Sequence, residues 1–142
     1  MIVRLEHTAL SVADLDRSLA FYRDLIGFKV VRVLEASPGE DLGKITAMAG
    51  ARARIAHLEL GEAMLELFEY RAPRGRPIPP DRRQADHGWI HMGLKSDDVP
   101  GDYERLGRIG VEFLGEPVQF RAGVWVVYFH GPDGEVCELR QT

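Results

Sequence analysis

Two stretches decide how this chain is organised: residues 5–12, LEHTALSV, and their counterpart at residues 89–95, WIHMGLK. Each reads as a strand with one histidine near its start, His7 or His91, followed by an acidic turn. A helical pattern that ends in glycine then follows in both halves. The chain therefore contains two copies of one skeleton, and a repeat of this kind fixes the fold before any other feature is weighed.

Each half also closes on a similar strand, GEAMLELFE at residues 61–69 and GEVCELRQ at residues 134–141. The length of 142 residues favours one domain. We expect that domain to consist of module one at 1–70, a linker at 71–88 and module two at 89–142. Neither module is large enough to bury a good core alone.

Periodicity and turn residues predict the individual elements. In module one we expect, in order, a strand at 5–12, a helix capped by Asp14 and stopped by Gly27, a strand at 28–35, a turn at 37–39, a short helix or mobile flap within 42–51, and a hairpin of 54–60 with 63–70 that turns at Gly61–Glu62. In module two we expect a strand at 90–95, a helix at 97–109, a broken strand at 111–120, a strand at 124–129, a turn at 131–135 and a last strand at 136–141.

Composition excludes several classes of protein. The net charge of −4 argues against a nucleic-acid binder that works by neutralising phosphates. No apolar run approaches the ~20 residues of a membrane span, and the charged start of the chain does not fit an ordinary signal peptide. Cys137 is the only cysteine, so no intramolecular disulfide forms, and we expect it in the core. We therefore expect a cytoplasmic protein.

The linker at 71–88 contains four prolines and two glycines, which deny it regular structure. It also carries five arginines, and two interpretations of them stay open. One is a basic flap that meets an anionic substrate, and the other is a solvated linker whose arginines pair locally. The arginines are Arg71, Arg74, Arg76, Arg82 and Arg83.

Four side chains occupy equivalent places in the two modules: His7 with His91, and Glu66 with Glu138. If the modules pack about a pseudo-twofold axis, these side chains converge, and two imidazoles with two carboxylates suit one divalent ion of Zn, Ni, Co, Mn or Fe. A single histidine or glutamate on a strand is usually structural, and Glu59 shows the same local pattern without the repeat position. The paired recurrence is what favours a metal site.

In the order of these pieces the chain resembles the vicinal oxygen chelate superfamily, also called the glyoxalase/bleomycin resistance/dioxygenase superfamily. The resemblance covers nearly the whole chain and is carried by HTALSVADLDRSLAFYRDLIGF, AMLELFEY, WIHMGLKSDDV and VVYFHGPDGEVCELRQ. It implies an α+β fold in which two βαβββ modules form a curved mixed-sheet cup around one metal. Its ligands carry over to His7, Glu66, His91 and Glu138.

The resemblance also implies an activity and an assembly. It implies a metal-dependent lyase, isomerase or epimerase that transfers a proton through a metal-chelated enediolate of a substrate with two neighbouring oxygens. Glu66 and Glu138 are the catalytic candidates, either of which would move the proton. Members of the superfamily are commonly dimers, so we expect a homodimer.

Alternatives within the superfamily remain. Ser11 and Tyr70 stand where glyoxalase I of bacteria carries an arginine and an asparagine, which disfavours a glutathione-thiohemiacetal substrate. An extradiol dioxygenase needs three open positions on its metal, and a ligand at Glu66 leaves only two. A metal-free antibiotic-binding protein would not need the histidine–glutamate set.

We further expect four residues to contact a small, anionic substrate: Ser11, Phe68, Lys95 and Arg140. For Lys95 and Arg140, which share strand faces with His91 and Glu138, the alternative is a rim charge in solvent.

Overall fold

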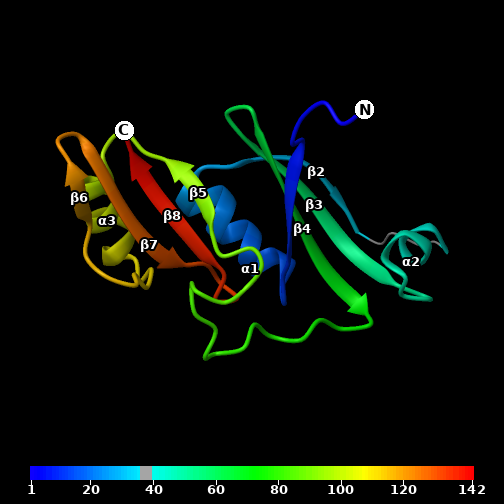
Figure 1. Cartoon of the computed structure of the whole chain (residues 1–142). Helices are drawn as coiled ribbons and strands as arrows, with labels where there is room; N and C mark the ends of the chain where they lie inside the picture. The colour runs from blue at the N-terminus through cyan, green and yellow to red at the C-terminus, as the bar shows by residue number, and fades with distance from the viewer. Residues whose placement is uncertain (36–39) are drawn as a thin grey trace. The chain divides into compact units, whose positions relative to one another are not determined.

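The computed structural model describes residues 1–35 and 40–142 and divides the chain into two compact units, Met1–Pro77 and Ile78–Thr142 (Figure 1). Each unit is a four-stranded mixed sheet with the element order βαβββ, and a further helix stands before the third strand of the first unit. The α+β fold expected from the sequence is therefore confirmed. The turn expected at 37–39 lies outside the described residues.

The first unit has the strand order β1-β4-β3-β2, in which β1 runs parallel to β4 and the other neighbours are antiparallel. Its elements are β1 (His7–Ser11), α1 (Leu15–Leu19), the π-helical turn η1 (Ala20–Ile26), β2 (Lys29–Leu34), α2 (Glu40–Thr46), β3 (Arg52–Leu60) and β4 (Ala63–Ala72). The sequence left open whether a short helix or a mobile flap lies within 42–51, and the structure has the helix α2 there.

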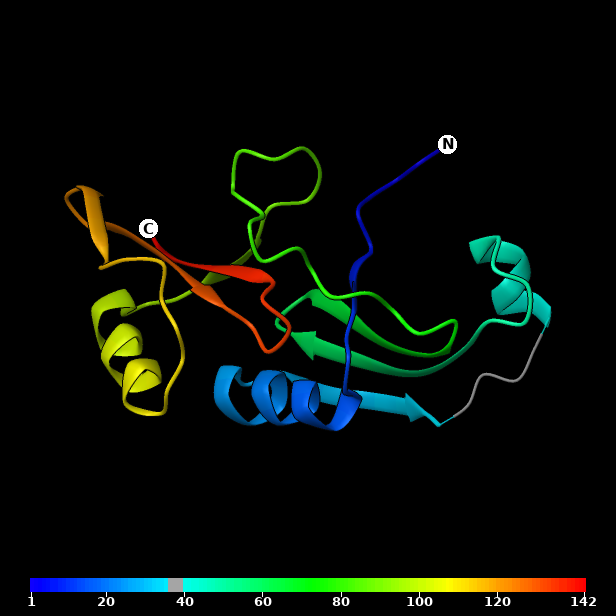
Figure 2. The ribbon, with the colours of Figure 1, turned by 90° about the horizontal axis from the view of Figure 1, so that it is seen from below.

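The continuous helix of α1 and η1 begins and ends where its sequence predicts. The Asp14 side chain accepts a hydrogen bond from the backbone N–H of Arg17, and Gly27 closes the last turn with φ of +102°, which favours glycine. Leu15 and Tyr22 are fully buried because the helix packs against β3 and β4, on one face of the sheet (Figure 2).

The side chains of β4 alternate strictly between its two faces. Leu65, Leu67 and Glu69 are buried on the face that packs against the helix, whereas Glu66 and Phe68 are half-buried on the opposite face. The predicted hairpin is present, with Leu60 opposite Ala63 across the turn. This alternation places Glu66 on the face that the helix does not cover.

The second unit repeats the plan with the strand order β5-β8-β7-β6. Its elements are β5 (Met92–Lys95), α3 (Val99–Arg108), β6 (Val118–Arg121), β7 (Val124–His130) and β8 (Val136–Gln141). His91 immediately precedes β5. Its core contains Val99, Leu106, Phe129 and Cys137, all fully buried, so the expectation for the cysteine is confirmed.

One predicted strand of this unit is wrong over most of its length. Residues 111–117 form no ladder, and only an isolated bridge joins Phe113 to Phe129 before β6 begins. Pro117 lacks a backbone donor and Gly115 has no side chain to pack, and both weaken a strand at this place.

A matching bond ties each helix to the last strand of its unit. Leu15, the first helical residue of α1, donates its backbone N–H to the Glu69 carboxylate at 3.2 Å. Val99, the first residue of α3, donates in the same way to the Gln141 side chain at 3.0 Å. Glu69 and Gln141 each lie three residues after a candidate site glutamate, so the repeat extends to the anchoring of the helices.

Buried Glu69 is also held by cations. Its carboxylate lies 3.3 Å from Arg54 and 3.1 Å from Arg71. Arg54 in turn pairs with Asp16 and Glu35, and its hydrogen bonds with these two carboxylates raise the pKa of Arg54. The hydrogen bond with Arg54 also lowers the pKa of Asp16. A buried carboxylate needs such partners because an unpaired charge away from water is costly. We therefore assign Glu69 a structural role.

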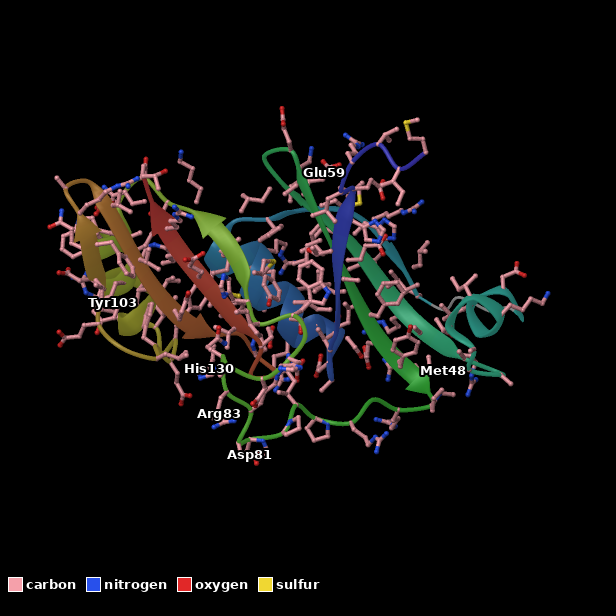
Figure 3. The ribbon with its side chains drawn as sticks, in the orientation of Figure 1. Met48, Glu59, Asp81, Arg83, Tyr103 and His130 are labelled. Carbon is pink, nitrogen blue, oxygen red and sulfur yellow. The ribbon has the colours of Figure 1, made fainter. Side chains whose placement is uncertain are left out.

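The other face of the first sheet carries a second apolar cluster where α2 covers it. Leu42, Ala51, Ala53 and Ile55 are buried there, and Phe68, Tyr70 and Met48 pack against them. Met48 lies near the end of β4, and Glu59 lies at the opposite end of the sheet, by the hairpin turn (Figure 3). Among the described residues, no helix has the length and apolar character required to cross a membrane.

Candidate functional site

In the first unit, His7 and Glu66 meet on neighbouring strands. The Nε2 atom of His7 lies 3.5 Å from Oε2 of Glu66. On its other side, Nδ1 of His7 makes a 2.6 Å hydrogen bond with the Glu6 carboxylate. This hydrogen bond with Glu6 raises the pKa of His7, the charge of Glu66 adds to the effect, and His7 in turn lowers the pKa of Glu6. Glu6 therefore orients the imidazole so that Nε2 faces Glu66.

In the second unit, His91 and Glu138 form the corresponding pair, with 3.6 Å between Nε2 and Oε2. The Nδ1 atom of His91 lies 3.4 Å from the amide oxygen of Gln84, and the imidazole packs against the Tyr128 ring at 5.0 Å. A Cβ atom at Gly93 would lie 3.3 Å from Oε2 of Glu138, so glycine leaves room for the carboxylate.

These two pairs fit a divalent cation. Two donors bound at 2.0–2.2 Å to one ion lie roughly 3.0–3.4 Å apart, close to both Nε2–Oε2 separations and longer than a good hydrogen bond. In both histidines Nδ1 faces an oxygen acceptor, which leaves the Nε2 lone pair directed to the carboxylate side. Within the residues that the structure describes, no group of three or more His, Cys, Asp or Glu side chains is arranged so that it could hold a metal ion by itself. The candidate ligands occur as two pairs, one in each unit.

Sequence reasoning missed His57, which lies beside Glu66. It is directly opposite Glu66 in the β3–β4 ladder, and its Nε2 lies 3.4 Å from Oε1 of Glu66. The signal was available, because a turn at Gly61–Glu62 pairs Leu60 with Ala63, and counting three residues away from the turn on each strand reaches His57 and Glu66. Glu6 and Gln84, the partners of the two candidate histidines, were missed as well.

The four residues predicted to contact substrate occupy equivalent register positions. Ser11 is opposite Phe68 on β1 and β4, and Lys95 is opposite Arg140 on β5 and β8. Phe68 stacks on Tyr70 with ring centroids 5.9 Å apart, whereas Lys95 and Arg140 are both exposed. The His7–Glu66 pair is therefore bordered by aromatic rings, and the His91–Glu138 pair by two cations.

Three of the five linker arginines have local partners. Arg71 pairs with Glu69, Arg82 donates to the carbonyl of Trp89, and Arg83 pairs with Asp86. These contacts agree with the interpretation of the segment as a solvated linker whose arginines pair locally.

Comparison with known proteins gives the class to which this chain belongs. Residues 4–139 match the Glyoxalase/Bleomycin resistance protein/Dioxygenase superfamily, and the chain belongs to this superfamily. A 2-epi-5-epi-valiolone epimerase from Actinomyces sp. is 37% identical, in an alignment that covers 96% of this chain and 78% of that protein. A probable lactoylglutathione lyase from Synechocystis sp. is 29% identical over 96% of this chain and 93% of its own length.

One further relative is similar in sequence, and two solved structures share the fold. Human mitochondrial methylmalonyl-CoA epimerase is 28% identical over 98% of this chain and 74% of its own length. A glyoxalase family protein from Bacillus cereus shares the fold with a TM-score of 0.89 at 22% identity, covering 99% of this chain and 94% of that one. The fosfomycin resistance protein FosX from Listeria monocytogenes, solved with Mn(II) and sulfate, has a TM-score of 0.63 at 20% identity, covering 100% of this chain and 94% of that one.

Proposed function

We propose that this protein is a metal-dependent epimerase that inverts a carbon next to a carbonyl in a small, anionic substrate with neighbouring oxygens. The observation that carries the proposal is the recurrence of one histidine–glutamate pair at the same register of two repeats, 3.5 Å apart in one and 3.6 Å apart in the other. The 37% identity to an epimerase favours inversion over the lyase reactions and the other isomerase reactions of the same superfamily.

In this proposal His7, Glu66, His91 and Glu138 together hold one divalent ion of Zn, Ni, Co, Mn or Fe. When bound, the ion supplies Lewis acidity to the substrate's oxygens and so makes the neighbouring C–H more acidic. The protein supplies the proton transfer: one glutamate removes the proton from the carbon, and the other returns a proton to the opposite face. Glu6 and Gln84 keep the two imidazoles in their binding orientation through Nδ1.

The surroundings of the two pairs lead us to propose different roles for them in binding the substrate. Lys95 and Arg140 stand side by side on the same sheet face as Glu138 and are exposed, so they suit an anionic group. The Phe68 and Tyr70 rings suit an apolar portion or a carbon ring. Ser11, opposite Phe68, would donate a hydrogen bond to a substrate oxygen.

The metal assignment predicts the ion content of purified protein. We expect about one divalent ion per chain in the wild type and a large loss in His91→Ala, because the variant removes one of four ligands. His87→Ala is the matched control, since His87 is an exposed histidine of the linker. Elemental analysis measures all three proteins. Equal ion content in the wild type and His91→Ala would contradict the ligand set.

The reaction is tested against extradiol ring cleavage, its competitor. We expect exchange of the substrate's α-hydrogen for deuterium in D2O, without O2 and with redox-inert Zn as well as with Fe. 2-epi-5-epi-valiolone, methylmalonyl-CoA and small 2-hydroxy ketones are the substrates to try, and oxygen uptake is measured in parallel with catechols. Oxygen uptake restricted to the Fe form, with no exchange in any substrate, would overturn the proposal and would remove Glu66 from the ligands.

We also propose that the protein is a homodimer. Each sheet has two edge strands, β1 and β2 in the first unit and β5 and β6 in the second, and open edges favour pairing with another chain. Light scattering is expected to give twice the mass of one chain at micromolar concentration. A mass equal to one chain would contradict the assembly.

A further inference from the structure

His57 makes contacts that single it out from the other histidines. Its side chain is 13% exposed, and it lies on β3 at the centre of the first sheet. Its Nε2 lies 3.4 Å from Oε1 of Glu66, while Oε2 of the same carboxylate lies 3.5 Å from Nε2 of His7. Each oxygen of Glu66 is therefore faced by one imidazole, and the two imidazoles come from different strands.

Arg32 fixes which nitrogen of His57 carries the proton. The Nε–H group of Arg32, on the neighbouring strand β2, donates a hydrogen bond to Nδ1 of His57 at 3.3 Å. A guanidinium group can only donate, so Nδ1 must offer its lone pair. In the neutral ring the single proton then sits on Nε2, the atom beside Glu66.

We propose that His57 is a positioning residue for Glu66. Held by Arg32 in the Nε2–H tautomer, it directs its N–H toward Oε1, which lies 3.4 Å away, and leaves Oε2 to the side of His7. The role rests on the proposed function, in which Glu66 is a metal ligand and moves a proton. A ligand carboxylate whose second oxygen is fixed in this way presents its first oxygen in one orientation, as partners of metal ligands generally do.

The second unit does not repeat this arrangement. The residue opposite Glu138 in the β7–β8 ladder is Tyr128, whose ring packs against His91. The position opposite the candidate glutamate is thus an imidazole in the first sheet and a phenol ring in the second. We therefore assign the Arg32–His57 pair to Glu66 alone, which gives the two site glutamates different surroundings.

The first test measures the tautomer of His57 in metal-free protein. Long-range proton–nitrogen spectra of protein with ¹⁵N-labelled histidine distinguish the two neutral tautomers, and the missing signals of His57→Gln assign the residue. We expect the Nε2–H pattern in the wild type and a mixture of tautomers in Arg32→Met. Arg52→Met, which changes an exposed arginine of β3, should leave the pattern unchanged. An Nδ1–H pattern in the wild type, or no change in Arg32→Met, would overturn the inference.

The second test measures Zn²⁺ affinity by calorimetry. His57→Leu removes the donor and is expected to weaken binding about 10–100-fold, the usual effect of losing a partner of a metal ligand. His57→Gln keeps an amide donor for Glu66 and an oxygen acceptor for Arg32, so it should bind close to the wild-type value. Equal affinities of the Leu and Gln variants, with unchanged circular dichroism, would contradict the positioning role. If the wild-type protein binds no Zn²⁺, the proposed function fails and the tautomer measurement alone decides the inference.

Discussion

Glu66→Gln and Glu138→Gln should each slow epimerisation by about 10²–10⁴-fold, the contribution that a positioned general base makes. Inversion of a carbon requires that a proton leave one face and that another arrive on the opposite face, and each glutamate is assigned one of these movements. A glutamine still offers an oxygen to a metal ion, but it cannot accept a proton at neutral pH. We therefore expect both variants to retain most of their metal.

The measurement combines epimerisation rates with ion content, so that loss of the base is separated from loss of the metal. Glu59→Gln is the matched control, because Glu59 is an exposed glutamate of β3 that lies between two leucines in sequence, as Glu66 does. It should leave the rate unchanged. Unchanged rates in both site variants would exclude the two glutamates as bases. A loss of rate that parallels a loss of ion would restrict their role to metal binding.

Phe129→Ala should lower the free energy of unfolding by about 3–5 kcal/mol, as the loss of a fully buried aromatic side chain does. Phe129 is wholly inaccessible on β7, and its ring lies 5.7 Å from that of Phe113, which in turn packs on Tyr103 at 4.5 Å. Truncation leaves a cavity among aromatic rings held by separate elements, so the surroundings cannot close over it easily.

Denaturation in urea, followed by circular dichroism, measures this loss. Phe120→Ala is the control: Phe120 lies on the edge strand β6 and is 72% exposed, so its truncation should change the free energy of unfolding by less than about 0.5 kcal/mol. A loss below about 1 kcal/mol in Phe129→Ala would show that the core of the second unit does not depend on this ring.

Local chemistry made most of the fold predictable. Asp14 and Gly27 delimit the first helix by capping and by a positive φ, and the alternation along residues 63–70 shows which face the helix covers. Gly115 and Pro117 indicated that the strand expected at 111–120 is broken, and the structure shortens it further, to the edge strand β6. Residues 111–117 contact the sheet through the single bridge of Phe113.

The candidate site was predictable for the residues that recur in both repeats. It was not predictable for the partners that folding brings to them from distant parts of the sequence. His7 and Glu66, and His91 and Glu138, recur at matching places, and each pair does meet within its own unit. His57 could have been found from the hairpin register. The contact of Arg32 with His57 could not, because a bulge between Val30 and Arg32 sets the register of β2. Gln84 reaches His91 from a linker that no periodicity describes.

The side chains of β4 alternate between two faces, so odd-numbered and even-numbered residues of this strand meet different demands. Leu65, Leu67 and Glu69 meet the helix and its anchor, so changes at these positions are expected to act on folding yield. Under the proposed function a change at Glu66 is expected to act on turnover, whereas Phe68 and Tyr70 also pack in the second apolar cluster, so changes there are expected to act on folding as well. A single inserted residue would exchange the two faces and abolish both properties together.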